Sequence, residues 1–251
     1  MSYGFSAVCD EFYVSCRLFL KLDLPLERET VLHFCDRIRK EFPGMSKFRR
    51  RDDGSLVLEE DAGAGMSRRW LRLEPNSLRF GHFAPPDVAD VRALADVVLE
   101  QAPYHLTLSE IDFDHLEVIY GFDLEYRGNH DQLVAEVLWA DHPLGAFLLG
   151  EESVHAIDAQ AYFGVALTRD CDLQAYIETR SRSSTFEVRT GEYERQPLSV
   201  FLTLRKYWTA TQGQALKDAA SALFDRADEL AGSRVVPLLV NPLAQAIASR
   251  L

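Results

Sequence analysis

The stretch Ile111–Tyr126, IDFDHLEVIYGFDLEY, decides the fold, because it is the longest run of alternating apolar and polar residues in the chain. Successive side chains of a β-strand point to opposite faces, so the even positions from Leu116 onward form one apolar face. Glu117, Asp123 and Glu125 fall on the other face. A shift of one residue would bury these three carboxylates. The alternation therefore predicts a strand with a firmly fixed register.

Strand and helix patterns follow one another on both sides of this stretch. Gly121 inside it predicts a bulge or the close approach of another backbone. Alternation predicts further strands at residues 5–22, 45–51, 55–60, 69–74, 78–83, 153–168, 173–180, 185–190 and 198–208. Apolar residues at i, i+3 and i+4 predict helices at residues 25–42, 87–102, 129–139, 213–231 and 241–251. The order indicates an α+β fold, in which antiparallel sheets pack against amphipathic helices, with a long C-terminal helix.

The two halves of the chain have similar patterns. Each combines long antiparallel strands with amphipathic helices, which suggests a duplicated unit of the β-α-β-β-α-β type. The two sheets would then join edge to edge or close around the last long helix. No linker divides the chain, and the best boundary is Gly128, between an N-terminal α+β half (1–128) and a C-terminal α+β half (129–251). We expect the two halves to form one continuous compact unit.

The composition is that of an acidic globular protein. The chain has 251 residues, 47% of them hydrophobic, and a net charge of −12. A surface of this sign repels phosphate backbones and anionic lipid, so nucleic acid and membranes are unlikely partners. Residues 1–80 carry a net charge of +1 and residues 81–251 one of −13. This asymmetry favours self-association of unlike surfaces, and we expect a homo-oligomer.

The N-terminal residues and the cysteines indicate a cytoplasmic protein. The beginning of the chain has neither the basic region nor the apolar region of a signal peptide. No apolar run reaches the length of a membrane span. The four cysteines Cys9, Cys16, Cys35 and Cys171 form no C-x-x-C pair and are expected to be reduced thiols.

Acidic residues gather at the start of the central strand. Asp112 and Asp114 share one face of an extended chain, and His115 follows directly. Two carboxylates at this spacing and a histidine can hold a hard divalent cation, the one cofactor that the sequence suggests. The alternative is that these acids face water at a strand entry and cap nearby backbone groups.

A basic stretch is the candidate polyanion-binding site. It contains Arg49, Arg50, Arg51, Arg68, Arg69 and Arg72. Phe48 and Trp70 lie among them, as stacking platforms would. Acidic residues lie beside the same stretch, including Asp53 and Glu59. The alternative prediction is therefore that cross-strand ion pairs neutralise most of the basic charge.

Several segments together resemble an uncharacterised, sporadically distributed family of bacterial α+β proteins. They are the Phe-rich first strand, EFPG at residues 41–44, HLEVIYGFDLEYRG at residues 115–128, and FDRADELAG followed by NPLAQAI near the end. These segments are hydrophobic patterns spread over most of the chain. The resemblance implies an α+β fold and carries over no activity and no catalytic residue.

The sequence contains no constellation typical of nucleophilic catalysis. It has no G-x-S-x-G motif, and Cys9, Cys16 and Cys35 fall at apolar-patterned positions, where a thiol stays protonated. We therefore expect a non-catalytic binding or scaffold protein that associates with itself. One alternative is a divalent-metal-dependent hydrolase or nuclease that uses Asp112, Asp114 and His115. A second is a carrier of small apolar ligands. The carrier's cavity would be lined by Phe163, Phe201, Leu204 and Phe224.

Overall fold

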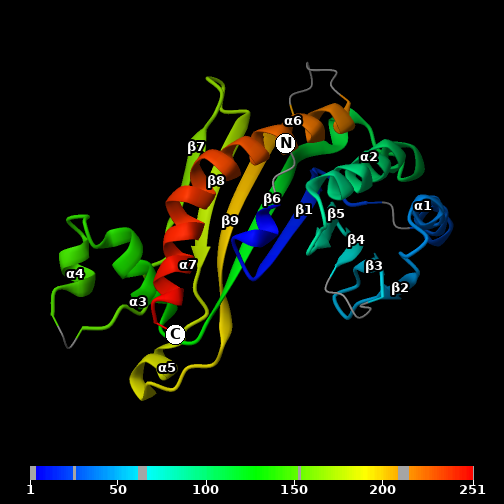
Figure 1. The fold of residues 1–251 in the computed structure, drawn as a ribbon. Coiled ribbons are helices and arrows are strands. Elements are labelled where there is room, and N and C mark those ends of the chain that lie inside the picture. The colour runs from blue at the N-terminus through cyan, green and yellow to red at the C-terminus, as the bar shows by residue number, and fades with distance from the viewer. Residues whose placement is uncertain (1–3, 25–26, 62–66, 152–153, 209–214, 251) are drawn as a thin grey trace.

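One antiparallel sheet of nine strands organises the molecule, in the order β2-β3-β4-β5-β1-β6-β9-β8-β7 (Figure 1). The computed structural model describes residues 4–24, 27–61, 67–151, 154–208 and 215–250. The strands are β1 (Glu11–Leu20), β2 (Lys47–Arg50), β3 (Leu56–Glu59), β4 (Arg68–Glu74), β5 (Ser77–Phe83), β6 (Phe113–Tyr126), β7 (Tyr162–Ala166), β8 (Leu173–Arg180) and β9 (Gln196–Tyr207). The alternating stretch Ile111–Tyr126 supplies β6, which lies in the middle of the sheet between β1 and β9.

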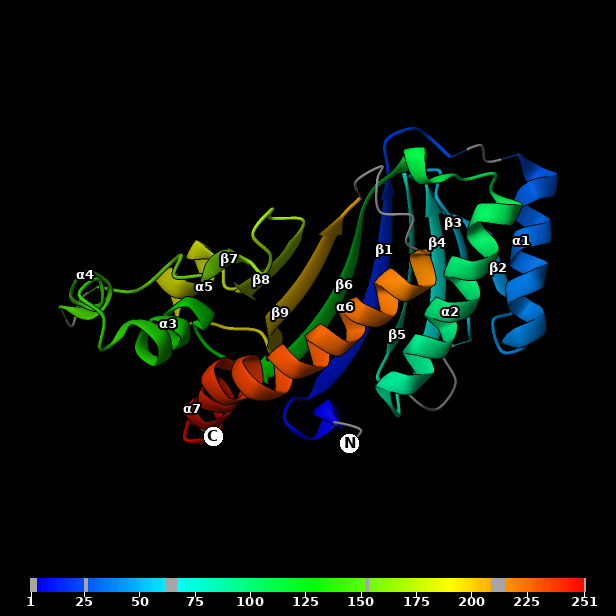
Figure 2. The same ribbon diagram turned by 90° about the horizontal axis from the view of Figure 1, so that it is seen from above.

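The main helices cover one face of this sheet (Figure 2). They are α1 (Arg28–Glu41), α2 (Val88–His105), α6 (Leu216–Leu230) and α7 (Asn241–Ala248). Three short helices lie near the β7 end: α3 (His130–Val134), α4 (Gly145–Leu149) and α5 (Thr185–Thr190). The predicted α+β architecture, with helices packed on an antiparallel sheet, is confirmed.

The core lies between the sheet and these helices. The even positions of β6 face it as predicted, and Leu116, Val118 and Phe122 have no exposed surface. The buried hydroxyl of Tyr120 donates a 2.6 Å hydrogen bond to Asp228 of α6. Asp228 also accepts a hydrogen bond from Arg92 of α2 at 2.8 Å. Both central helices are thus tied to each other and to β6 at one point.

The chain follows the same path twice. In each half the first strand (β1 or β6) takes the centre of the sheet, the next strand crosses to the outside, and the remaining strands return inward to a closing helix (α2 or α6). By this path β5, β4 and β3 correspond to β9, β8 and β7, and no strand in the described part of the second half corresponds to β2. The halves join edge to edge through antiparallel pairing of β1 with β6. The repeat divides the chain between α2 and β6, ahead of the expected boundary at Gly128.

The predicted strand at residues 153–168 is wrong for most of its length. Only Tyr162–Ala166 form β7, and residues 154–161 are irregular. Side chains of α3 replace the sheet partners there: Asp131 accepts from the backbone N–H of Ala159 and Gln132 from that of Ala156. Alternation alone cannot reveal such a side-chain substitute for a β-ladder.

The predicted strand at residues 185–190 is also wrong, because Thr185–Thr190 form α5. Ser184 and Glu187 make a reciprocal capping box at its start, and Gly191 ends it with a φ of 73°. These residues carry a recognisable helix signature, S-x-x-E followed by Gly, which outweighs the short alternation of Phe186 and Val188 with polar residues.

The helix predicted at residues 213–231 does not end there. It continues through η4 (Ala231–Val240), a π-helical segment, into α7, and residues 213–214 lie outside the described residues. Pro237 lies inside η4 and has no N–H to donate, which accounts for a change of hydrogen-bond register there. By length and composition alone, the resulting run Leu216–Ala248 could cross a membrane, with 33% of its most apolar window buried in the protein. In this fold its α6 part packs against β6 and β9.

Candidate binding face

The face of the sheet opposite the main helices, here the open face, carries two parallel rows of side chains. Strand register places directly paired residues on the same face, so each row can be followed across the sheet. The arginine row is Arg49, Val57, Arg72, Arg79, Arg17, Glu117, Arg205 and Gln174. The aromatic row is Arg68, Phe83, Tyr13, Gly121, Phe201, Glu178 and Tyr162. Trp70 and Tyr176 lie between the two rows.

Arginines stack on most of the aromatic rings of the open face. The distances from guanidinium carbon to ring centre are 4.0 Å for Arg17 on Phe19, 5.3 Å for Arg79 on Trp70, 5.2 Å for Arg68 on Phe83, 4.9 Å for Arg180 on Phe201 and 4.9 Å for Arg205 on Tyr176. Such contacts shield ring surface from water while the charged ends stay accessible. The open face can therefore remain solvated and still offer both charge and apolar surface to a ligand.

Two glycines of the open face lie beneath aromatic rings from the neighbouring strand. A Cβ added to Gly121 would lie 2.3 Å from the Tyr13 ring, and one added to Gly164 would lie 2.6 Å from the Tyr176 ring. The close approach predicted for Gly121 is thus made by a ring and not by another backbone. Because only glycine leaves room for them, the rings can lie across the sheet surface.

Strand alternation divides the six arginines of the predicted polyanion site. Arg49, Arg68 and Arg72 lie on the open face, and Arg51 lines a pocket there. Arg50 and Arg69 point to the helix side. The two proposed platforms separate in the same way, because Trp70 is on the open face and Phe48 is not.

Ion pairs engage much of the basic stretch, as the alternative prediction stated. Arg49 binds Glu59 at 2.6 Å, and Arg72 binds Asp53 at 2.5 Å. On the helix side Arg69 binds Glu60 at 2.9 Å. Within the described parts of the chain, Arg50, Arg51 and Arg79 form no ion pair. Arg79, which the prediction did not include, lies in the middle of the open-face group.

A pocket of about 200 Å³ opens beside Arg79. It is lined by Arg51, Val57, Glu59, Arg68, Trp70, Arg72, Arg79 and Phe83. The side chains come from β3, β4 and β5, which hold them in fixed register, and from the end of β2. Burial lowers the pKa of Arg79, and the neighbouring Arg17 and Arg72 lower it further.

The predicted metal ligands are engaged in other contacts. Asp112 accepts hydrogen bonds from the Ser109 N–H and hydroxyl, both at 2.8 Å, as the cap of η2 (Glu110–Asp112). Asp114 is hydrogen-bonded to Nδ1 of His115 at 2.8 Å, and the His115 ring stacks on Phe19 at 4.1 Å. In the described residues, no three His, Cys, Asp or Glu side chains form a group that could hold a metal ion. The capping interpretation therefore has support, and the metal site stays a prediction.

Glu117 is the acidic residue of the arginine row and is buried. Arg205 binds its carboxylate at 2.6 Å, and Nε2 of His115 lies 3.6 Å away. Burial alone would raise the pKa of Glu117, but these two neighbours hold it below its usual range. Alternation placed Glu117 correctly on the polar face, although it could not show that the face is partly buried.

The cysteines are free thiols. Burial raises the pKa of Cys9 and of Cys35 to about 12, and raises that of the fully buried Cys16 as well. These three thiols stay protonated at neutral pH, as the apolar pattern predicted, and none has the environment of a nucleophile.

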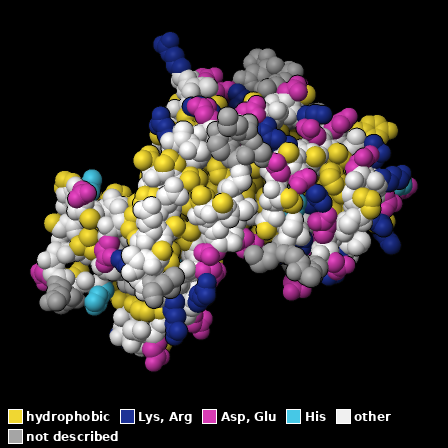
Figure 3. Space-filling view, viewed as in Figure 1, with side chains coloured by type: hydrophobic (Ala, Val, Ile, Leu, Met, Phe, Trp, Pro, Cys, Tyr) yellow, Lys and Arg dark blue, Asp and Glu magenta, His cyan; other side chains and the backbone are white. Residues whose placement is uncertain are grey.

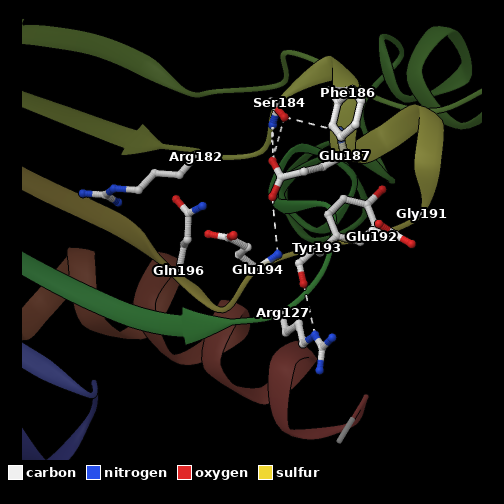
Figure 4. Close-up of a pocket in the computed structure, with 10 residues that line it drawn as sticks. All are labelled: Arg127, Arg182, Ser184, Phe186, Glu187, Gly191, Glu192, Tyr193, Glu194 and Gln196. Carbon is white, nitrogen blue, oxygen red and sulfur yellow. Dashed lines mark hydrogen bonds between the residues drawn. The ribbon is translucent and has the colours of Figure 1, made fainter.

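A pocket of about 830 Å³ lies between α5 and the start of β9 (Figure 4). Its side chains are used in local structure. Glu187 caps α5, the backbone N–H of Glu194 donates to Glu187, and Arg127 donates to the Tyr193 carbonyl at 3.0 Å. These residues therefore maintain the local fold around a surface pocket, and none of them is a free reactive group.

An apolar groove of about 220 Å³ lies on the helix side, where β7 and β8 meet α6 and η4. Phe163, Val165 and Ile177 line it, and hydrophobic side chains reach the surface in this region (Figure 3). The cavity predicted for an apolar ligand does not form as expected. Phe201 points to the open face, and Leu204 and Phe224 are buried in the core.

In comparisons with known proteins, no family model and no curated protein matches this sequence. The resemblance to a bacterial α+β family stays a prediction.

Proposed function

We propose that this protein is a non-catalytic binding protein that associates with itself through the edge of β7 and presents the open face of its sheet to a ligand. The observation that carries the proposal is the unprotected β7 edge. Inert thiols, and acidic residues used for capping, favour binding over catalysis. We expect the protein to be cytoplasmic. We expect neither a membrane nor nucleic acid as its partner.

The two edges of the sheet differ in chemistry. β2, at one edge, has the sequence KFRR, and charged residues on an edge strand discourage pairing with another chain. β7, at the other edge, has the sequence YFGVA, with no charge and no proline. All five of its residues are exposed. An edge of this kind is a template for a further strand.

The internal repeat indicates what is missing at β7. β7 occupies the place that β3 has in the first half, and β3 is covered by β2. Among the described residues of the second half, no strand corresponds to β2. A strand from a second molecule would therefore fill a position that the fold itself fills in the first half.

A second copy of β7 fits this position, because an antiparallel pair can be centred on Gly164. Phe163 would then lie opposite Val165 of the partner subunit. Both side chains point to the helix side and line the apolar groove there. Aromatic and β-branched residues form favourable cross-strand pairs. A strand that pairs with itself about a two-fold axis gives a closed dimer.

We expect the wild-type protein to sediment as a dimer and Phe163→Lys to sediment as a monomer, because the lysine places two charges beside each other at the new strand pair. The matched control is Phe48→Lys at the opposite edge. The two phenylalanines are similarly exposed, 48% for Phe163 and 43% for Phe48. Sedimentation velocity over a range of protein concentrations measures the result.

A wild-type protein that is monomeric at every concentration contradicts the self-association. A dimer that Phe48→Lys dissociates and Phe163→Lys leaves intact would place the interface at β2 instead. Circular dichroism of each variant confirms that the fold is kept.

A further inference from the structure

The pocket beside Arg79 contains more positive charge than its carboxylates balance. Four arginines line it against one carboxylate, that of Glu59. Two further arginines belong to the same group, because Arg49 shares Glu59 with Arg68 and Arg17 shares Glu74 with Arg72. The group then contains six arginines and three carboxylates, those of Asp53, Glu59 and Glu74. The whole chain has a net charge of −12. The arginines of this cluster repel one another, and this local repulsion disfavours the folded state.

Arg79 is the centre of this imbalance. It lies directly between Arg72 and Arg17 in the arginine row, and like charges opposite each other in a sheet are destabilising. Its Nε atom is buried and has no hydrogen-bond partner among the described residues. Stacking on Trp70 holds the guanidinium in place at the wall of the pocket. A buried donor without a partner costs free energy. Arg79 also lines the pocket, so an anion bound there would compensate its charge, which no carboxylate of the described residues does by an ion pair.

We propose that this pocket binds a phosphate dianion, either free or as the monoester of a small molecule. The planar guanidinium groups of Arg68, Arg72 and Arg79 suit the oxygens of such a group. The six arginines and three carboxylates of this group leave three positive charges, which a dianion compensates better than a carboxylate does. The volume of about 200 Å³ admits a phosphate with a small substituent.

The surroundings disfavour a nucleic-acid strand. Beyond Arg17 the arginine row is neutralised, because Arg205 binds Glu117 at 2.6 Å. A polymer would therefore find one anion site and no continuous cationic track. The pocket lies at the β2 end of the sheet, and β7 lies at the other. The inference thus goes beyond the proposed self-association and stands or falls separately from it.

The test measures binding of sodium phosphate and of phenyl phosphate by isothermal titration calorimetry, at constant ionic strength. Variants are Arg79→Met, whose side chain still covers Trp70, and Arg51→Met, which changes an exposed residue. The matched control is Arg50→Met, because Arg50 lies on the helix side of the same edge region and forms no ion pair with a described residue. A single-stranded oligonucleotide without a terminal phosphate is the third ligand.

We expect Arg79→Met to weaken phosphate binding by at least about tenfold, Arg51→Met to weaken it less, and Arg50→Met to leave it unchanged. Without ligand, the melting temperature of Arg79→Met should equal or exceed that of the wild type, because an unpaired charge is removed. Binding of phosphate alone identifies the free ion, and tighter binding of phenyl phosphate identifies a monoester. No binding of either, equal binding by Arg79→Met, or Arg79-dependent binding of the oligonucleotide alone would overturn the proposal.

Discussion

His82 shows how one buried side chain sets a pH limit on the fold. Its ring is 1% exposed, and Nε2 lies 2.8 Å from the Ser67 hydroxyl. Burial, and then the charge of Arg69, lower the pKa of His82 to about 4 from a usual value of 6.5. The folded protein therefore keeps His82 neutral at pH values where the unfolded chain takes up a proton.

The contribution of His82 to the free energy of unfolding should thus be fully present above pH 6.5. It should be lost as the pH drops from 6.5 toward about 4. We expect His82→Gln to flatten this fall, although not to abolish it, since the pKa values of His105 and His130 are lowered too. Urea unfolding at several pH values in this window measures the slope. His155→Gln, at an exposed position, is the control, and equal slopes for His82→Gln and wild type would contradict the assignment.

For single residues, the sequence could indicate which face of the sheet a side chain takes but not which side chain it pairs with. Alternation placed Glu117 and Asp123 on the polar face and showed that the region around Arg49 to Arg72 is rich in both charges. It could not single out Arg79, because the isolation of that guanidinium depends on which carboxylates Arg17 and Arg72 reach across the sheet. Such choices are made by side-chain geometry in the assembled sheet.

Within the strands, glycines differ in what they lie against. A Cβ at Gly81 would lie 2.5 Å from the backbone oxygen of Val14, which cannot move without disturbing β1. The three atoms nearest to a Cβ at Gly164 all belong to the Tyr176 ring, a side chain that can shift more readily than a backbone. We expect Gly81→Ala to destabilise the fold by roughly 3 kcal/mol and Gly164→Ala by about 1 kcal/mol or less.

Chemical denaturation of both glycine variants measures this difference. Equal losses of stability would mean that the Val14 backbone can yield as readily as a tyrosine ring. The strand edge at Gly164 also belongs to the proposed dimer, so both variants should be compared at the same protein concentration.

Elements with one repeated signal were predictable, and elements with competing signals were not. Clean alternation in β1, β4, β5, β6, β8 and β9 predicted strands that the structure confirms. The helix predicted from residue 87 is also confirmed as α2, and the Asp87 side chain at its start accepts from the Ala89 N–H at 2.9 Å. In α5 the short alternation Thr185–Thr190 competed with the capping box at Ser184 and Glu187, and the local hydrogen bonds prevailed.

For the whole molecule, the salt dependence of self-association distinguishes two kinds of interface. Contact between unlike surfaces, suggested by net charges of +1 for residues 1–80 and −13 for residues 81–251, should weaken strongly as salt screens it. Pairing of β7 edges relies on backbone hydrogen bonds and apolar contacts. We therefore expect the dimer dissociation constant to change less than about threefold between low and moderate salt. A steep loss of dimer with salt would favour the charge-based interface.

The repeated patterns in the two halves were visible in the sequence, but the way they join was not. Edge-to-edge joining and closure around the last helix were both open, because strand order depends on contacts between residues far apart in the chain. The pairing of β1 with β6 settles the question in favour of a single sheet. The division of the repeat before β6 was hidden, because β6 follows α2 after only a short connection.

The junction between the two repeats, where β1 pairs with β6, could also form between two molecules. Within the sheet β6 pairs with β1, and on the helix-covered face α6 contacts α2. Each repeat thus meets the other through strand pairing and a helix contact. A repeat from a second molecule could take the same place with every one of these contacts preserved. The architecture therefore carries a built-in route to domain exchange, in which the connection between α2 and β6 would act as the hinge.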